Sequence, residues 1–277
     1  MRRYWPLLKS LQTGLLVGTG LAGYMSARCP IFNLGTVLGV AASLLLAVSG
    51  STVLNMWWDR DIDAVMPRTQ RRPLCSGAIT PGEALRLGVW LAIAGVGLAV
   101  AMDTRYGLVV LVGLICDVAV YTVWLKRRTC WSIVWGGIAG AMPILAGRVL
   151  AVGGIDWIGV SLALGILLWI PTHILTYSLR YADDYRAAGI PTFASTYGIG
   201  AARSAIALSS LLAALSMGVS AWQIGLTTLH LSSLAVLSLI LVGLAALSLV
   251  HPTDRVNSRL FNYASVYMLL SMCLMAF

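Results

Sequence analysis

Residues 34–63 read LGTVLGVAASLLLAVSGSTVLNMWWDRDID, a long apolar run that ends in three aspartates. A helix that crosses the hydrocarbon core of a bilayer needs about 20 mainly apolar residues. The run therefore predicts a transmembrane helix over residues 34–58, with its acidic end in water. This stretch indicates a membrane protein that carries polar chemistry at one membrane face.

The rest of the chain repeats the pattern of apolar runs separated by short polar connections. Of its 277 residues, 59% are hydrophobic and only 10% are charged, which is far more apolar than an ordinary soluble domain. We therefore predict an all-α integral membrane protein whose single domain spans residues 1–277. Nine transmembrane helices are expected, at residues 7–27, 34–58, 84–102, 106–125, 131–152, 157–180, 200–222, 228–250 and 259–277.

The distribution of charge predicts the orientation. If the N-terminus is cytoplasmic, the cytoplasmic connections carry all but three of the 19 Lys and Arg residues, the exceptions being Arg28, Arg105 and Arg148. Basic residues concentrate on the cytoplasmic side of membrane proteins. We therefore expect the protein in the cell membrane, with its site facing the cytoplasm, where most of the ten acidic residues also fall. A nucleic-acid partner is excluded because no soluble basic surface remains.

The acidic end of residues 34–63 has the spacing of a ligand set. Asn55, Asp59 and Asp63 are four residues apart and share one face of a helix, whereas Asp61 points elsewhere. Carboxylate and amide oxygens suit Mg²⁺, which usually completes its coordination with substrate phosphates. Acidic residues are also unfavourable at the C-terminal end of a helix. The stripe therefore predicts a magnesium site for a phosphorylated ligand.

Cationic residues and a second acidic pair accompany this stripe. Arg68 and Arg72 follow it within a loop that contains Pro73 and Gly77, and guanidinium groups bind phosphate oxygens in a bidentate fork. Lys126 and Arg127 add further positive charge, and Asp183–Asp184 follows the expected sixth span. If the two acidic patches face each other, they could hold two metal ions on one diphosphate.

Several motifs occur in order along the chain: Asn55-x-x-x-Asp59-x-x-x-Asp63, Arg68-Thr-x-x-Arg72-Pro-Leu-x-x-Gly77, Tyr121-Thr-x-x-Leu-Lys126-Arg127-Arg128-Thr129, Gly136-Gly-x-x-Gly140-Ala-x-Pro143, Pro171-Thr-His173 and Asp184-Tyr-x-x-Ala-Gly189-Ile-Pro191. Together they resemble the UbiA superfamily of intramembrane prenyltransferases, and within it the haem O synthase (protoheme IX farnesyltransferase) branch. The resemblance runs from about residue 7 to the end of the chain.

The resemblance implies a bundle of nine helices around a central cavity that the aspartate clusters cap. It also implies transfer of the farnesyl group of farnesyl diphosphate to a vinyl group of haem B, a substrate rather than a permanent cofactor, to give haem O. The expected catalytic residues are Asp59, Asp63, Asp184 and Lys126. The expected ligands of two Mg²⁺ ions are Asn55, Asp59, Asp63, Asp183 and Asp184, and the diphosphate is expected to contact Arg68, Arg72, Lys126 and Arg127.

His173 and Arg148 are the candidates for binding the acceptor. An imidazole can ligate haem iron or orient an acceptor, and it can equally be a hydrogen-bonded core residue. Arg148 could meet a haem propionate or pair with Asp117, another charge expected within the membrane. Two other functions stay open: a UbiA-type transferase acting on a chlorin, a quinone precursor or a glycerol phosphate lipid, and a transporter. A transporter would place polar residues through both halves of the membrane, whereas here they lie on one side.

Overall fold

The computed structural model describes residues 2–27 and 33–276, so Arg28 and the last residue of the expected ninth span lie outside the described part. All regular secondary structure in the described residues is helical. Eight segments are long and apolar enough to cross a membrane. These segments are α2 (Leu34–Trp58), α4 (Pro81–Met102), α5 with η2 (Thr104–Ile115 and Cys116–Leu125), α6 (Ser132–Val152), α7 (Trp157–Arg180), α10 (Ile199–Ile224), α11 (Thr228–Val250) and α12 (Asp254–Ala276).

The first α-helix observed is shorter than the span predicted at residues 7–27. A 3₁₀-helix, η1 (Arg2–Leu8), precedes α1 (Ser10–Met25), and Lys9 between them has a left-handed backbone with φ of 41°. The 16 residues of α1 reach only about 24 Å. Hydropathy could not reveal this break, because a single residue in a left-handed conformation leaves the apolar pattern unchanged.

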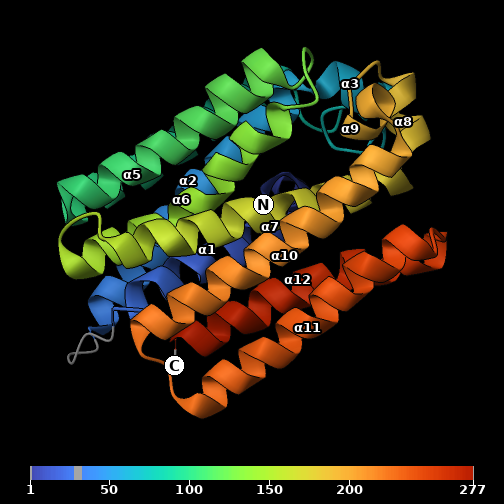
Figure 1. Cartoon of the computed structure of the whole chain (residues 1–277). Helices are drawn as coiled ribbons and strands as arrows, with labels where there is room; N and C mark the ends of the chain where they lie inside the picture. The colour runs from blue at the N-terminus through green and yellow to red at the C-terminus, as the bar shows by residue number, and fades with distance from the viewer. Residues whose placement is uncertain (1, 28–32, 277) are drawn as a thin grey trace.

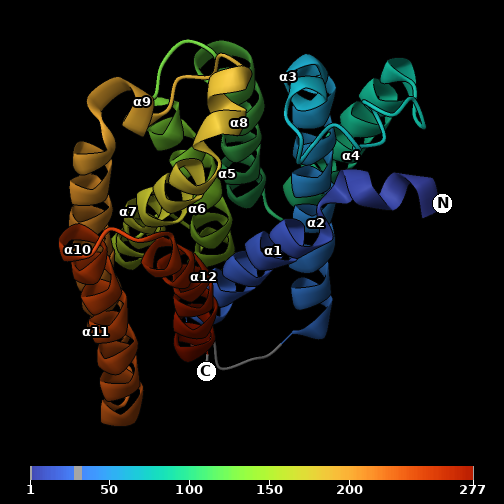
Figure 2. The same ribbon diagram turned by 90° about the vertical axis from the view of Figure 1, so that its right-hand side faces the viewer.

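Three short helices gather at one end of the bundle. They are α3 (Arg60–Val65), α8 (Ala182–Ala187) and α9 (Phe193–Tyr197), and both ribbon views show them at the same end of the bundle (Figures 1 and 2). The C-terminal ends of α2, η2 and α7 point to this end of the molecule (Figure 1). The basic loop, residues 66–80, connects α3 to α4 and lies at the same end.

Two large apolar clusters fill the bundle. One is built mainly from α7, α10, α11 and α12, and the other mainly from α2, α4 and α5, while α6 contributes to both. Small residues let the helices approach closely. A Cβ atom at Gly50 of α2 would lie 2.5 Å from the backbone nitrogen of Ala92 in α4. The end of the bundle that carries α3, α8, α9 and the basic loop, called the polar end below, is therefore built from both the N-terminal and the C-terminal parts of the chain.

Candidate active site

The predicted stripe of Asn55, Asp59 and Asp63 continues past the C-terminal end of α2. The helix ends at Trp58 and α3 begins at Arg60, yet the amide of Asp59 donates to the carbonyl of Asn55 (2.9 Å) and that of Asp63 donates to Asp59 (2.8 Å). These i to i−4 bonds keep the three residues on one face. Asp59 and Asp63 are only 1% and 5% exposed. Two carboxylates are therefore held side by side, away from bulk water.

Each buried carboxylate has a cationic partner. Lys126 donates to Asp59 in a very short contact, and Arg72 donates to Asp63 at 2.5 Å. Burial opposes the charged ammonium, but the neighbouring Tyr121 and Asp59 raise the pKa of Lys126 overall. Lys126 is therefore a permanent cation at this site.

Asp61 faces outward, as the spacing predicted. Its side chain is 61% exposed and accepts two hydrogen bonds from Arg127, at 2.6 and 2.7 Å. These bonds lower the pKa of the Asp61 carboxyl. The Nη2 atom of Arg127 also lies 3.7 Å from Oδ1 of Asp59, so this guanidinium borders the buried pair of carboxylates from outside.

The second acidic patch contributes one carboxylate. Asp184 lies 3.6 Å from the Arg68 guanidinium, which also lies over the rings of Tyr177, Tyr181 and Tyr185. Asp183 instead points into solvent with its side chain 92% exposed and pairs with Arg186 at 2.9 Å. The structure therefore does not bring Asp183 and Asp184 together as joint ligands, because neighbouring residues on a helix diverge by about 100°.

The basic loop joins the two patches. Arg72 contacts Asp63, and Arg68, four residues earlier in the same loop, contacts Asp184. Ile62 and Met66 also form an apolar cluster with Ile190, which follows α8. A cavity of about 330 Å³ lies between these segments, lined by Asp61, Ile62, Val65, Arg127 and residues 187–190. Carboxylates from α3 and from α8 thus each contact an arginine of the same loop.

The donor set fits a hard divalent cation completed by a ligand. One oxygen of Asp59, Oδ1, is buried without a hydrogen-bond partner among the described residues. Within those residues no three acidic, His or Cys side chains form a group able to hold a metal alone. An ion here would therefore need the amide of Asn55 and oxygens from a phosphorylated substrate, as Mg²⁺ sites commonly do.

Comparison with known proteins identifies the family of the chain. Residues 16–271 match the model of the UbiA prenyltransferase family. The chain belongs to this family. A protoheme IX farnesyltransferase of Pyrobaculum neutrophilum is 35% identical over the full length of both chains. One of Archaeoglobus fulgidus is 45% identical over 73% of this chain and 71% of its own.

Solved structures show the same fold. The structure described as that of a digeranylgeranylglyceryl phosphate synthase has a TM-score of 0.81 at 18% identity, and covers 99% of this chain and 96% of its own. A UbiA homologue from Archaeoglobus fulgidus bound to GPP and Mg²⁺ has a TM-score of 0.70 at 14% identity, over 99% and 100% of the two chains. The protein is thus a UbiA-type prenyltransferase with an all-helical membrane fold.

His173 of this prenyltransferase lies within an aromatic stack in the membrane. Its ring is sandwiched between Trp169 and Phe261, with centroids 5.0 and 4.6 Å away, and its Nδ1 lies 3.3 Å from the hydroxyl of Ser265. Phe261 also contacts Tyr177, which lies beneath Arg68. The stack therefore runs along α7 and α12 from the imidazole to the polar end.

Arg148 lies far from that end. It is ~24 Å along α6 from Ser132 by helical rise, and it forms bidentate bonds with Asp156 and donates to Ser26. The carboxylate that pairs with Arg148 is therefore Asp156 and not Asp117, which accepts a bond from Ser51. Burial raises the pKa of Asp156, but the bonds from Arg148 lower it overall. The geometry favours a structural role for Arg148 over the expected contact with the acceptor.

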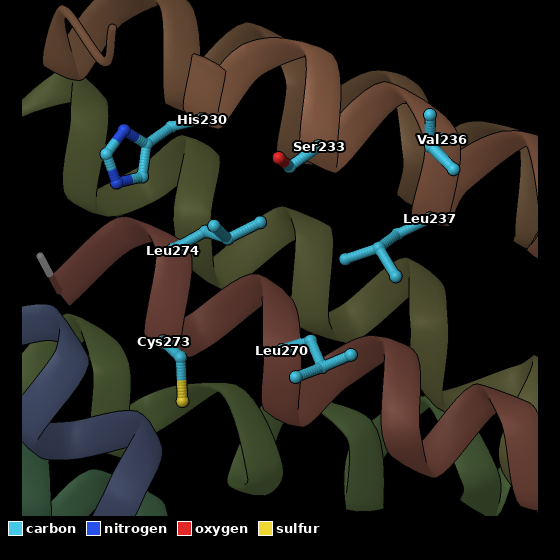
Figure 3. Close-up of a pocket in the computed structure, with 7 residues that line it drawn as sticks. All are labelled: His230, Ser233, Val236, Leu237, Leu270, Cys273 and Leu274. Carbon is cyan, nitrogen blue, oxygen red and sulfur yellow. The ribbon is translucent and has the colours of Figure 1, made fainter.

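A second cavity lies away from the paired charges. It measures about 610 Å³ and is lined by α11 and α12 through His230, Ser233, Val236, Leu237, Leu270, Cys273 and Leu274 (Figure 3). None of the predicted site residues lines it. This cavity therefore gives no support to the predicted site residues, and the candidate site rests on the paired charges.

Sequence reasoning missed several residues of the site. Tyr177, Tyr181 and Tyr185 all contact the Arg68 guanidinium with their rings. Their four-residue spacing could have indicated that the three rings share one face. Lys9 is close enough to Arg72 and Lys126 for their charges to act on it. Burial and these neighbours lower the pKa of Lys9 to about 8. Nothing in the sequence pattern indicated that Lys9 lies near these two cations.

Proposed function

We propose that this prenyltransferase transfers the farnesyl group of farnesyl diphosphate to a vinyl group of haem B, giving haem O. The observation that carries the proposal is the pair of buried carboxylates, Asp59 and Asp63, held against Lys126 and Arg72 beside the Arg68–Asp184 contact. The choice of donor and acceptor is supported by relatives named protoheme IX farnesyltransferase, one of which matches over its whole length.

Positive charge at the site would bind the diphosphate. Lys126, Arg72 and Arg68 now pair with carboxylates, and Arg127 borders the same region. Mg²⁺ held by Asn55, Asp59 and Asp63 would neutralise these carboxylates and the diphosphate together, and a second ion would involve Asp184. A UbiA homologue with the same fold has been solved with GPP and Mg²⁺, which supports this assignment. The four cations would then turn from the carboxylates to the phosphate oxygens.

The cations also account for the rate of bond cleavage. As the bond between C1 of the farnesyl chain and the diphosphate oxygen breaks, negative charge grows on the leaving diphosphate. Fixed positive charges at that point stabilise the transition state more than the ground state. The allylic carbon then forms a bond to the terminal vinyl carbon. Water adds to the other vinyl carbon and releases one proton, so the products are haem O, diphosphate and a proton.

His173 is our candidate for holding the acceptor. Its two ring faces are covered by Trp169 and Phe261, but ligation of haem iron uses the lone pair in the plane of the imidazole. We expect haem B added to the purified protein to show a shifted absorption band that disappears in His173→Ala and persists in His230→Ala. An unchanged spectrum in His173→Ala would assign this residue to the packed core.

The proposed orientation places the site at the cytoplasmic face of the cell membrane. The two acidic patches and the basic loop occupy one end of the bundle (Figure 2). If the N-terminus is cytoplasmic, the connections on that side carry all but three of the 19 basic residues, which is the asymmetry that favours a cytoplasmic location. Cysteine labelling from either side of sealed vesicles, with single cysteines placed at Arg71 and at Gly154, would test this orientation.

One assay separates the candidate acceptors. Purified protein in nanodiscs is incubated with Mg²⁺, labelled farnesyl diphosphate and, in turn, haem B, a chlorin, a quinone precursor or a glycerol phosphate lipid. We expect label transfer to haem B alone. Preferential transfer to the glycerol phosphate lipid would overturn the haem assignment; the structural likeness to the digeranylgeranylglyceryl phosphate synthase, at 18% identity, is one of fold.

A further inference from the structure

Three polar contacts follow one another along the interface between α2 and η2. The α2 side of each contact lies one helical turn from the next. In order toward the polar end, the pairs are Ser51 with Asp117, Asn55 with Thr122, and Asp59 with Lys126. The last pair belongs to the site already described, so this polar ladder leads directly into it.

The register of the ladder depends on the π-helical winding of η2. The α2 residues advance by four positions at each step, whereas their partners advance first by five and then by four. A π-helix closes its bonds between residues five apart, and single π turns are frequent at functional sites. With α-helical winding, the residue four after Asp117 would be Tyr121 instead of Thr122. The wider turn thus brings a small hydroxyl group to Asn55.

The hydroxyl of Thr122 fixes the orientation of the Asn55 amide. A hydroxyl has one proton, and Thr122 donates it to the backbone carbonyl of Asp117 at 2.7 Å. Thr122 can therefore only accept from Asn55, whose Nδ2 lies 2.8 Å away. Both residues are buried. The amide nitrogen must face Thr122, which leaves Oδ1 as the atom available to a cation.

We propose that Thr122 is a positioning residue that orients Asn55 as a ligand of the substrate-bound divalent cation. This inference rests on the proposed role of Asn55 in holding Mg²⁺. If instead Thr122 only caps a carbonyl of the π-helix, its loss would lower stability without changing the affinity for the metal. The two roles therefore predict different affinities for Mg²⁺, which can be measured without turnover.

The test measures Mg²⁺ binding without an acceptor. Purified Thr122→Val is titrated with Mg²⁺ in the presence of farnesyl diphosphate, and the half-saturating concentration is read from the rise in melting temperature. We expect it to increase about 10- to 100-fold, the usual effect of losing a residue that orients a metal ligand. Thr122→Ser keeps the hydroxyl and should stay within about threefold of the wild type.

Two controls make the outcome specific. Thr19 is buried in α1 and donates its hydroxyl only to the carbonyl of Leu16, so Thr19→Val should leave Mg²⁺ half-saturation unchanged. Adding Thr122→Val to Asn55→Ala should also have no further effect, because Thr122 acts through Asn55. If Thr122→Val lacks a cooperative melting transition, Thr122→Ala takes its place.

Failure of the positioning role of Thr122 can be distinguished from failure of the metal-binding role of Asn55. Normal Mg²⁺ binding in Thr122→Val, together with weakened binding in Asn55→Ala, would overturn the positioning role alone. Normal binding in Asn55→Ala would remove Asn55 from the metal site and with it this part of the proposed function. Failure of Thr122→Ser to restore binding in a folded protein would also contradict the hydroxyl as the orienting group.

Discussion

Asp59 and Asp61 are two positions apart but experience different surroundings. Asp59 is almost completely buried against Lys126, whereas Asp61 is mostly exposed beside Arg127. We expect Asp59→Asn to reduce farnesyl transfer at least about 100-fold, because it removes a buried carboxylate that would hold the Mg²⁺ neutralising the leaving diphosphate. Asp61→Asn should stay within about fivefold of the wild type, since exposed ion pairs contribute at most about 1 kcal/mol. Initial rates at saturating Mg²⁺ would compare them.

The folding of each variant must be checked by its melting temperature. Asp59→Asn leaves the Lys126 charge partly buried without its partner, so a lower melting temperature is expected. A folded Asp59→Asn that retains full activity would remove this carboxylate from the site.

Lys9 gives the site a predictable pH dependence. Burial lowers its pKa to about 8, so the charged fraction of the ammonium falls as the pH rises through 8. The positive charge that attracts a diphosphate therefore falls as the pH rises from 7 to 9. We expect the association rate of farnesyl diphosphate to fall over this range, and Lys9→Gln to be slower at pH 7 and to lack the change. Equal pH dependence in both proteins would exclude Lys9 as the cause.

At the scale of elements, the contact between α1 and α6 depends on glycine. A Cβ atom at Gly23 would overlap the carbonyl of Ile144, and one at Gly147 would overlap the carbonyl of Gly20. Gly18, on the same α1, has no atom within 4 Å of such a Cβ. We expect Gly23→Ala to destabilise the bundle by about 1–3 kcal/mol, the usual cost of overpacking.

Gly18→Ala is the matched control and should be neutral or slightly stabilising, since alanine favours helix. Reversible denaturation followed by tryptophan fluorescence would measure both variants. Equal stabilities would indicate that α1 can shift away from α6 at little cost. Because α1 follows directly on Lys9, the same displacement would also move a cation of the site.

The sequence pattern predicted those features that follow from local periodicity. The stripe of Asn55, Asp59 and Asp63 was predictable because i to i−4 bonds continue through the end of α2. The pairing of Lys126 with Asp59 was not, because it depends on how separate helices pack. The division between Asp183 and Asp184 follows from local helix geometry, because neighbouring residues diverge by about 100°. The π-helix also escaped prediction, since its apolar composition resembles that of an α-helix.

At the scale of the whole molecule, the site joins two parts of the bundle that have separate apolar clusters. The α2–α3 side supplies Asp59 and Asp63, and the α7–α8 side supplies Asp184. Between them, the described contacts at the polar end are the Arg68–Asp184 pair with its tyrosines and the small cluster of Ile62, Met66 and Ile190. A ligand that binds both sides should therefore tighten the whole bundle.

We expect farnesyl diphosphate with Mg²⁺ to stabilise the protein by about 2.7 kcal/mol at 100 times its dissociation constant, because it binds only the folded state. EDTA should abolish the gain. Asp184→Ala should weaken it, whereas Asp183→Ala should not, since the Asp183 side chain points into solvent beside Arg186. Hydrogen exchange would show where the tightening occurs. Protection is expected both in the basic loop and in residues 181–190, and protection of only one of them would mean that the diphosphate does not bridge the two sides.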